Sequence, residues 1–163
     1  MTLRLSIITL IFGLAACGEK PADEEMNTPQ TTSPPESPES EPQSIPRSAS
    51  TEGASVFFIT PEDGATVTNP ITIEFGITGM DVVKAGNNQP HSGHHHLLID
   101  TELPDLGMPI PADEHHVHFG DGSTSTQISL SPGTHKLQML LGDYLHIPHD
   151  PPLTSAQFTI TVE

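Results

Sequence analysis

All ten histidines of the chain lie between His91 and His149. The densest stretch is HSGHHHLLID, residues 91–100, in which four histidines precede an apolar run. Further histidines occur in HHVHFGD, residues 115–121, and in LHIPHDPP, residues 145–152. Imidazole nitrogen is the commonest protein ligand of transition metals, and sites built from it suit Cu(II), Zn(II) and Ni(II). The spacing raises the question of whether these segments meet at one ion.

The elements that must position the histidines are β-strands. From residue 54 onward, short runs rich in β-branched and aromatic residues alternate with Gly, Pro, Asn and Asp. We expect strands at residues 55–60, 71–78, 94–100, 115–119, 125–130, 134–141 and 156–162. Seven short strands in a domain of about 110 residues predict an all-β, immunoglobulin-like antiparallel β-sandwich spanning residues 54–163.

Strand direction sorts the histidines between the two ends of such a sandwich. If successive strands alternate in direction, the connections after the second, fourth and sixth strands share one end. Three segments bring histidines to this end, namely His91, His94 and His96, then His118, and then His146 and His149. His135 follows the turn SPGT and belongs at the opposite end, so we interpret it as structural.

Side-chain alternation adds a further expectation for the middle segment. In HVH, His116 and His118 share one strand face about 7 Å apart, close enough to chelate one ion. In the triplet HHH, His95 points opposite to its neighbours, so at least one of the three is expected to point inward. The candidate metal ligands are therefore His91, His94, His96, His116, His118, His146 and His149.

The pattern favours copper, with zinc next, and leaves other interpretations open. Acidic neighbours such as Asp100, Asp113 and Asp143 are available to orient ligands, and Met80 and Met108 are soft donors for Cu(I). One alternative is a non-catalytic interaction module in which the histidines are structural or sense pH. A second is a redox metalloenzyme, because HVHFGD resembles a stretch of copper–zinc superoxide dismutases, although one residue is missing from the match. The sequence leaves open whether the protein is an enzyme and favours a non-catalytic role.

The first 17 residues resemble a bacterial lipoprotein signal. Arg4 precedes the apolar run LSIITLIFGL, which is too short to span a membrane, and LAAC ends at Cys17. The resemblance implies that Cys17 is lipidated and anchors the protein to a membrane of the cell envelope, on its periplasmic face. Gly18 stands where an Asp would retain the protein in the inner membrane, which favours the outer membrane. Cys17 is the only cysteine, so disulfides and thiolate ligands are excluded.

Residues 18–53 are rich in Pro, Ser and Glu and nearly lack aliphatic side chains. Such a segment cannot bury enough apolar surface to offset its ordering entropy, so we expect a disordered tether. The whole chain has 21 acidic and 5 basic residues. This balance excludes nucleic acid as a partner, because nucleic-acid binding needs basic patches. The expected partners are a metal ion and, through the lipid, the membrane.

Four blocks together resemble a known family. They are SGHHHLLID, HVHFGDGSTST, LSPGTHKLQMLLGDYLHIPHDPP and FTITV, which lie in the same order and spacing over residues 86–163 as in the bacterial domain of unknown function 4399. The resemblance implies a small exported domain whose signature positions include the histidines of these blocks. It implies no activity, because the function of that family is unassigned.

Overall fold

The computed structural model describes residues 45–163, and the expected signal segment, Cys17 and most of the expected tether lie outside these residues. Nine strands form in the described part. They are β1 (Ser55–Thr60), β2 (Thr66–Val67), β3 (Ile71–Thr78), β4 (Asp81–Val82), β5 (Ser92–Ile99), β6 (His116–His118), β7 (Ser125–Ile128), β8 (Gly133–Gly142) and β9 (Phe158–Val162). The all-β prediction is confirmed. No helix in residues 45–163 is long and apolar enough to cross a membrane.

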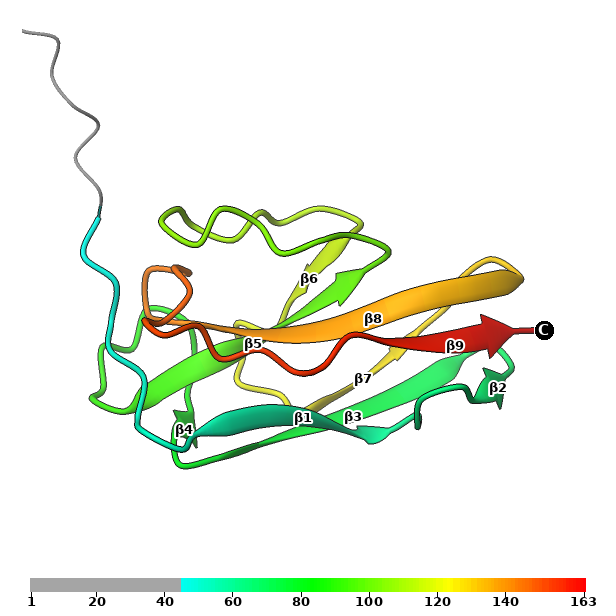
Figure 1. Ribbon diagram of the computed structural model, residues 1–163, viewed down its shortest axis with the longest axis horizontal. Helices are drawn as coiled ribbons and strands as arrows, with labels where there is room; N and C mark the ends of the chain where they lie inside the picture. The colour runs from blue at the N-terminus through cyan, green and yellow to red at the C-terminus, as the bar shows by residue number, and fades with distance from the viewer. Residues whose placement is uncertain (1–44) are drawn as a thin grey trace, which may run out of the picture. The chain divides into compact units, whose positions relative to one another are not determined.

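The strands form two sheets that face each other (Figure 1). One sheet has the order β1-β3-β7, and the other has the order β2-β9-β8-β5-β4, with β6 also paired to β5. The seven expected strands correspond to all of these except the two-residue strands β2 and β4. The first, second and fifth expected strands share one sheet and the other four share the second. In a constant-type immunoglobulin domain the fourth strand joins the first, second and fifth, so the division of this sandwich differs by that strand.

The hydrophobic core lies between the two sheets. Alternate residues of β3, Ile71, Ile73 and Phe75, are buried there, and they meet Leu97 of β5 and Met139 of β8 in one cluster. Side chains of a strand alternate between its faces, so each sheet contributes every second residue to this core. The core is apolar, with His95 as the one histidine packed against its aromatic rings, 4.7 Å from Phe75 between ring centroids.

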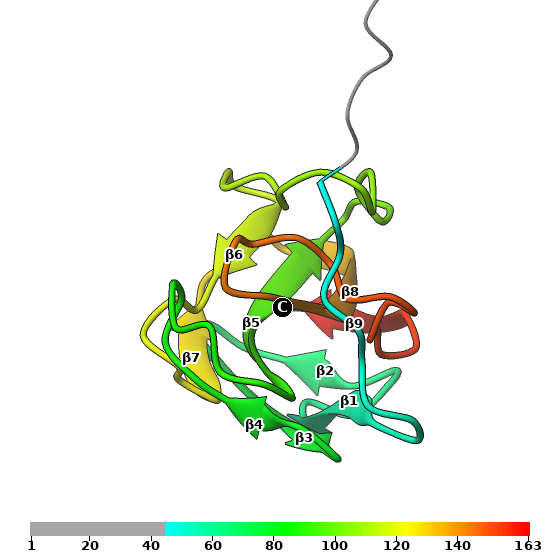
Figure 2. The same cartoon turned by 90° about the vertical axis from the view of Figure 1, so that its left-hand side faces the viewer.

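The outer face of the larger sheet is also covered. All eight residues of β5 are buried, although alternation alone predicts burial on one face only. The connection between β5 and β6, residues 100–115, lies on the side of this sheet away from β1, β3 and β7 (Figures 1 and 2). Its Ile110 packs in a second buried cluster with Leu98 and Leu140. The outward side chains of β5 therefore lie between the sheet and this cover.

The compact part of the chain begins earlier than the expected boundary at residue 54. Residues 47–50, which we call the strap, run beside the connection between β8 and β9 (Figure 2). Ala49 forms a parallel bridge with Asp150, and the strap exchanges backbone hydrogen bonds with it: Ser50 N donates to Asp150 O at 3.1 Å and Asp150 N donates to Ser48 O at 2.9 Å. Residues 47–50 therefore belong to the sandwich and not to the tether.

His135 has the structural role that its position predicts, at the end of the sandwich opposite to His94. Its Nδ1 lies 2.7 Å from Asp100 Oδ2, and its Nε2 lies 2.9 Å from Ser131 O. Both ring nitrogens donate only when the imidazole is protonated. The hydrogen bond to Asp100 accordingly raises the pKa of His135, against the opposing effect of burial.

This pair predicts a pH-dependent loss of stability in His135→Leu. Because the folded-state pKa of His135 is above its unfolded value near 6.5, its contribution is complete below that pH and is lost as pH rises through the raised pKa. We expect the substitution to lower the free energy of unfolding by about 1.5–3 kcal/mol at pH 6 and by less at pH 9. Urea unfolding at both pH values measures the difference, and an equal loss at both would contradict a charged pair.

Candidate metal centre

Four imidazole rings meet on the covered outer face of the larger sheet. His94 and His96 come from β5, His118 comes from β6, and His146 comes from the connection after β8. The ring centroid of His94 lies 4.9 Å from that of His96, 4.9 Å from that of His118 and 4.8 Å from that of His146. The centroids of His118 and His146 are 4.8 Å apart. We call these four residues the histidine cluster.

Three members of the cluster have the spacing of metal ligands. One nitrogen from each of His94, His96 and His118 lies within 4.8 Å of the others, and the Nε2 atoms of His94 and His96 are 3.1 Å apart. Two imidazole nitrogens on a tetrahedral zinc, each about 2.0–2.1 Å from the metal, would be separated by about 3.3 Å. The three rings therefore need only small movements to bind one ion.

Strand pairing explains why these rings converge. β5 pairs with β6 with His96 directly opposite His118, so their side chains leave the sheet on the same face. His94 shares that face because it lies two residues away on the same strand. The spacing between the rings is thus set by backbone register, which is a rigid feature of the fold.

Two glycines leave room for the rings. A Cβ atom at Gly142, opposite His94 on β8, would lie 3.0 Å from His96 Nε2. A Cβ atom at Gly120 would lie 2.3 Å from His118 Cε1, closer than real side chains approach. Any larger residue at Gly120 would displace the His118 imidazole. Sequence reasoning missed both glycines, and the one available signal was their closeness to histidine segments.

The fourth ring is held by a tight turn. His146 has a φ of 67°, a left-handed conformation that non-glycine residues seldom adopt. Its N–H donates to Asp143 O at 2.9 Å, and its carbonyl accepts from Ile110 N at 2.8 Å. The buried Asp143 carboxylate accepts through Oδ1 from Leu145 N at 2.9 Å and from Ile147 N at 3.0 Å. These bonds fix the turn that presents His146.

Burial and mutual repulsion lower the pKa of three of these rings, those of His94, His96 and His118. Burial, followed by the neighbouring His146 and His118, lowers the pKa of His94 to about 4. Burial, followed by the neighbouring His94 and His118, lowers the pKa of His96 to about 2. Burial and His146 also lower the pKa of His118. Metals bind the neutral imidazole, so the lowered pKa values keep His94, His96 and His118 in their ligating form near pH 7.

Access to the cluster is one-sided. His94 and His96 are about 1% exposed, whereas His118 is exposed and His146 is half-buried. The Nδ1 atoms of His94 and His96 have no hydrogen-bond partner within residues 45–163. The Nε2 atoms of the same two rings lie 3.1 Å apart, so Nε2 is the nitrogen that each ring turns toward the other. An ion would enter from the side of His118 and His146 and meet two rigid rings beneath.

The structure places three of the predicted ligands, His91, His116 and His149, outside the cluster. His91 is exposed and its Nδ1 lies 3.0 Å from Thr51 Oγ1. His116 shares a face with His118, but its Nδ1 lies 2.8 Å from Asp113 Oδ1. His149 is buried, with its Nε2 3.1 Å from Ser92 O. The structure therefore groups His118 with two rings of β5 across the strand pair, and not with His116 along its own strand.

The location of the cluster also differs from the expectation of a site on the rim. The predicted shared end is present, because His94, His118 and His146 all lie toward it. However, His94 and His96 share the outer face of β5 with Leu98, which packs against Ile110 of the connection of residues 100–115. The sequence of that connection has no periodic pattern that predicts its path over the sheet.

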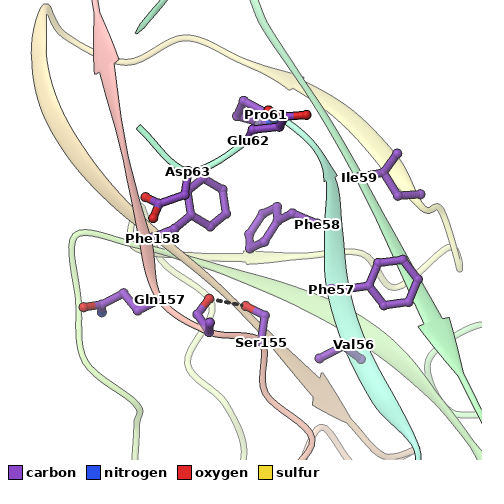
Figure 3. Close-up of a pocket in the computed structure, with 11 residues that line it drawn as sticks. Val56, Phe57, Phe58, Ile59, Pro61, Glu62, Asp63, Ser155, Gln157 and Phe158 are labelled. Carbon is purple, nitrogen blue, oxygen red and sulfur yellow. Dashed lines mark hydrogen bonds between the residues drawn. The ribbon is translucent and has the colours of Figure 1, made fainter. Parts of the chain in front are cut away.

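A cavity without histidines lies between β1 and residues 155–158 (Figure 3). Its volume is about 340 Å³, and Phe58 and Phe158 form an edge-to-face pair in its wall, 4.4 Å apart between centroids. Among its lining residues, Ser155 Oγ donates to Ala156 O at 2.8 Å (Figure 3). Histidines are absent from the described residues that line it. This cavity therefore contributes nothing to the candidate metal centre.

Replacing His95, the histidine in the hydrophobic core, should raise the stability of the protein. His95 is fully buried, and neither of its ring nitrogens has a partner within residues 45–163. We expect His95→Leu to raise the free energy of unfolding by about 1 kcal/mol at pH 7, because it removes buried atoms without partners.

The gain should increase at acidic pH. Burial lowers the pKa of His95 to about 4, so its neutral folded form loses stability as pH falls from 6.5 toward 4. At pH 5 the replacement should add about 2 kcal/mol more. Urea unfolding at pH 7 and pH 5 measures both values, with the exposed His91→Leu as the control. A loss of stability at pH 5 would show that the His95 ring is needed.

Comparison with known proteins identifies the family but not an activity. No curated protein and no solved structure matches the chain. The family model described as Domain of unknown function (DUF4399) matches residues 73–163, which include most of β3, all of β4 through β9 and the whole histidine cluster. The chain therefore belongs to the DUF4399 family.

Proposed function

We propose that this protein is a lipid-anchored protein of the cell envelope that binds a transition metal through the histidine cluster. The observation that carries the proposal is the convergence of His94, His96 and His118, with one nitrogen of each within 4.8 Å of the others. His146 is the proposed fourth ligand, because its ring lies 4.8 Å from those of His94 and His118. The proposed anchor is an acyl chain on Cys17.

Copper is the favoured metal and zinc the next. The proposed ligands are all imidazole nitrogens, which suit both ions, and a nitrogen site generally binds Cu(II) more tightly than Zn(II). Hard cations such as Ca²⁺ and Mg²⁺ need oxygen ligands and would bind poorly. With Cys17 acylated the chain offers no thiolate, so the proposed site differs from the sulfur-rich sites that select Cu(I).

The geometry of the histidine cluster suits reversible binding of a metal ion better than catalysis on a substrate. His94 and His96 form a buried, register-fixed floor, whereas His118 and His146 lie on the accessible side. Binding through two fixed and two more accessible rings suits capture, storage, delivery or sensing. The low pKa values of His94 and His96 argue against a pH sensor working near neutrality, because these rings stay neutral until pH falls to about 4.

Metal titration of the full chain in detergent tests the proposal. We expect the protein to bind one Cu(II) or Zn(II) ion with micromolar or better affinity. Each of His94→Ala, His96→Ala and His118→Ala should weaken binding at least about 100-fold, because loss of a ligand costs more than the 10- to 100-fold typical of a residue behind the ligands. Calorimetric titration with each metal provides the measurement.

The matched control is His91→Ala, which removes an exposed histidine near the start of the same strand. Its affinity should equal that of the unmodified protein. Absence of binding by the unmodified protein would refute the proposal and leave an interaction module with structural histidines. Equal weakening by His91→Ala would show that binding occurs on dispersed surface histidines.

A further inference from the structure

We infer that Arg47 and Ser48 of the strap are positioning residues of the metal centre, which hold the turn that presents His146. The inference rests on the proposed metal-binding function. It concerns a part of the chain that lies upstream of the family match at residues 73–163. Both residues are joined to the cluster through hydrogen bonds to the connection between β8 and β9.

The first connection is between Ser48 and Asp143. Ser48 Oγ donates to Asp143 Oδ2 at 2.7 Å. Asp143 is 2% exposed, so this carboxylate is almost entirely removed from water. A buried carboxylate needs several hydrogen bonds to its oxygens, and Ser48 supplies the one made to Oδ2. Without the hydroxyl, Oδ2 would have to draw in water or turn away.

The second connection is between Asp143 and His146. Oδ1 of the same carboxylate accepts from Leu145 N and Ile147 N, the residues on either side of His146, at 2.9 Å and 3.0 Å. His146 N itself donates to Asp143 O at 2.9 Å. Rotation of the carboxylate would break the bonds that maintain the left-handed conformation of His146. The orientation of the His146 ring is therefore linked to Ser48 through one side chain.

Arg47 holds the residues that follow the turn, 148–150, in the connection between β8 and β9. Its Nε donates to Pro148 O at 2.9 Å, its Nη2 donates to His149 O, and its Nη1 lies 3.4 Å from Asp150 Oδ1. One guanidinium thus joins three consecutive residues that follow the turn. Its planar fork of donors restrains this backbone more than a flexible ammonium group would.

These contacts make the strap a preorganising element. The binding-competent position of His146 is populated in the free protein because the strap holds it there, and a ligand held in place raises the affinity of the site. Binding linkage is reciprocal, so a metal bound by His146 must in turn stabilise the docked strap. Metal occupancy would thereby be transmitted to the chain that leads to Cys17.

The test uses Arg47→Ala and Ser48→Ala in the full chain, with Ser48→Thr to restore the hydroxyl. We expect each alanine variant to bind one Cu(II) about 10-fold more weakly, as is usual for residues that orient a ligand. The electron paramagnetic resonance spectrum of the bound Cu(II) should show loss or alteration of one nitrogen ligand, as in His146→Ala. Ser48→Thr should restore both affinity and spectrum. Thr51→Ala is the control, because its hydroxyl contacts His91 outside the cluster.

A second measurement separates positioning from a merely structural role. Hydrogen exchange of the Ser50 and Asp150 amides, which join the strap to the sandwich, should slow when Zn(II) binds the unmodified protein. It should not slow in His146→Ala. If the unmodified protein binds metal and the strap variants match it in affinity and spectrum, the inference is overturned and the proposed function stands. If the unmodified protein binds neither metal, both are overturned.

Discussion

The pairing of β5 between β6 and β8, with its outer face covered, is the constraint on which the rest of the structure depends. This pairing sets His96 opposite His118 and His94 opposite Gly142, so register alone fixes three rings on one face. A shift of one residue would turn His94 and His96 into the core and Leu97 out of it. The apolar core between the sheets, with Leu97 and Met139 fully buried, prevents that shift. The packing that stabilises the fold therefore also aligns the candidate ligands.

Burying a ring nitrogen without a hydrogen-bond partner destabilises the folded state, and the buried histidines of this protein differ in whether they have such partners. The rings of His94, His95 and His96 all keep buried nitrogen atoms without partners in the described part of the chain, and burial lowers the pKa of each. A sandwich selected for stability alone would place apolar side chains at these positions, since unsatisfied polar atoms destabilise the folded state. His135, which has two partners and no place in the cluster, shows the arrangement expected of a structural histidine. His95 also lacks partners but lies in the core, so it is the convergence of His94, His96 and His118 that favours a ligand-binding role for the cluster.

Much of this arrangement could be predicted from the sequence, because alternation and turn residues report strand positions directly. The bounds of β1 and β3 agree with prediction. Strand direction also correctly placed His94, His118 and His146 at the same end of the sandwich. The path of residues 100–115 could not be predicted, since a cover held by single contacts such as Ile110 leaves no periodic pattern. The docking of the strap was also missed. The composition of the strap is that of a tether. Its contact with Asp143 could not be predicted, because the Asp143 carboxylate becomes buried only when the chain folds.

The most direct test of the account is a crystal structure of the protein grown with Cu(II) or Zn(II), with anomalous data collected at the edge of that metal. We expect one strong anomalous peak on the outer face of the larger sheet. The peak should lie about 2.0–2.1 Å from one nitrogen each of His94, His96 and His118, with His146 completing the site. A peak at His91, His116 or His149 instead, or no peak within ligand distance of His94 and His96, would contradict it.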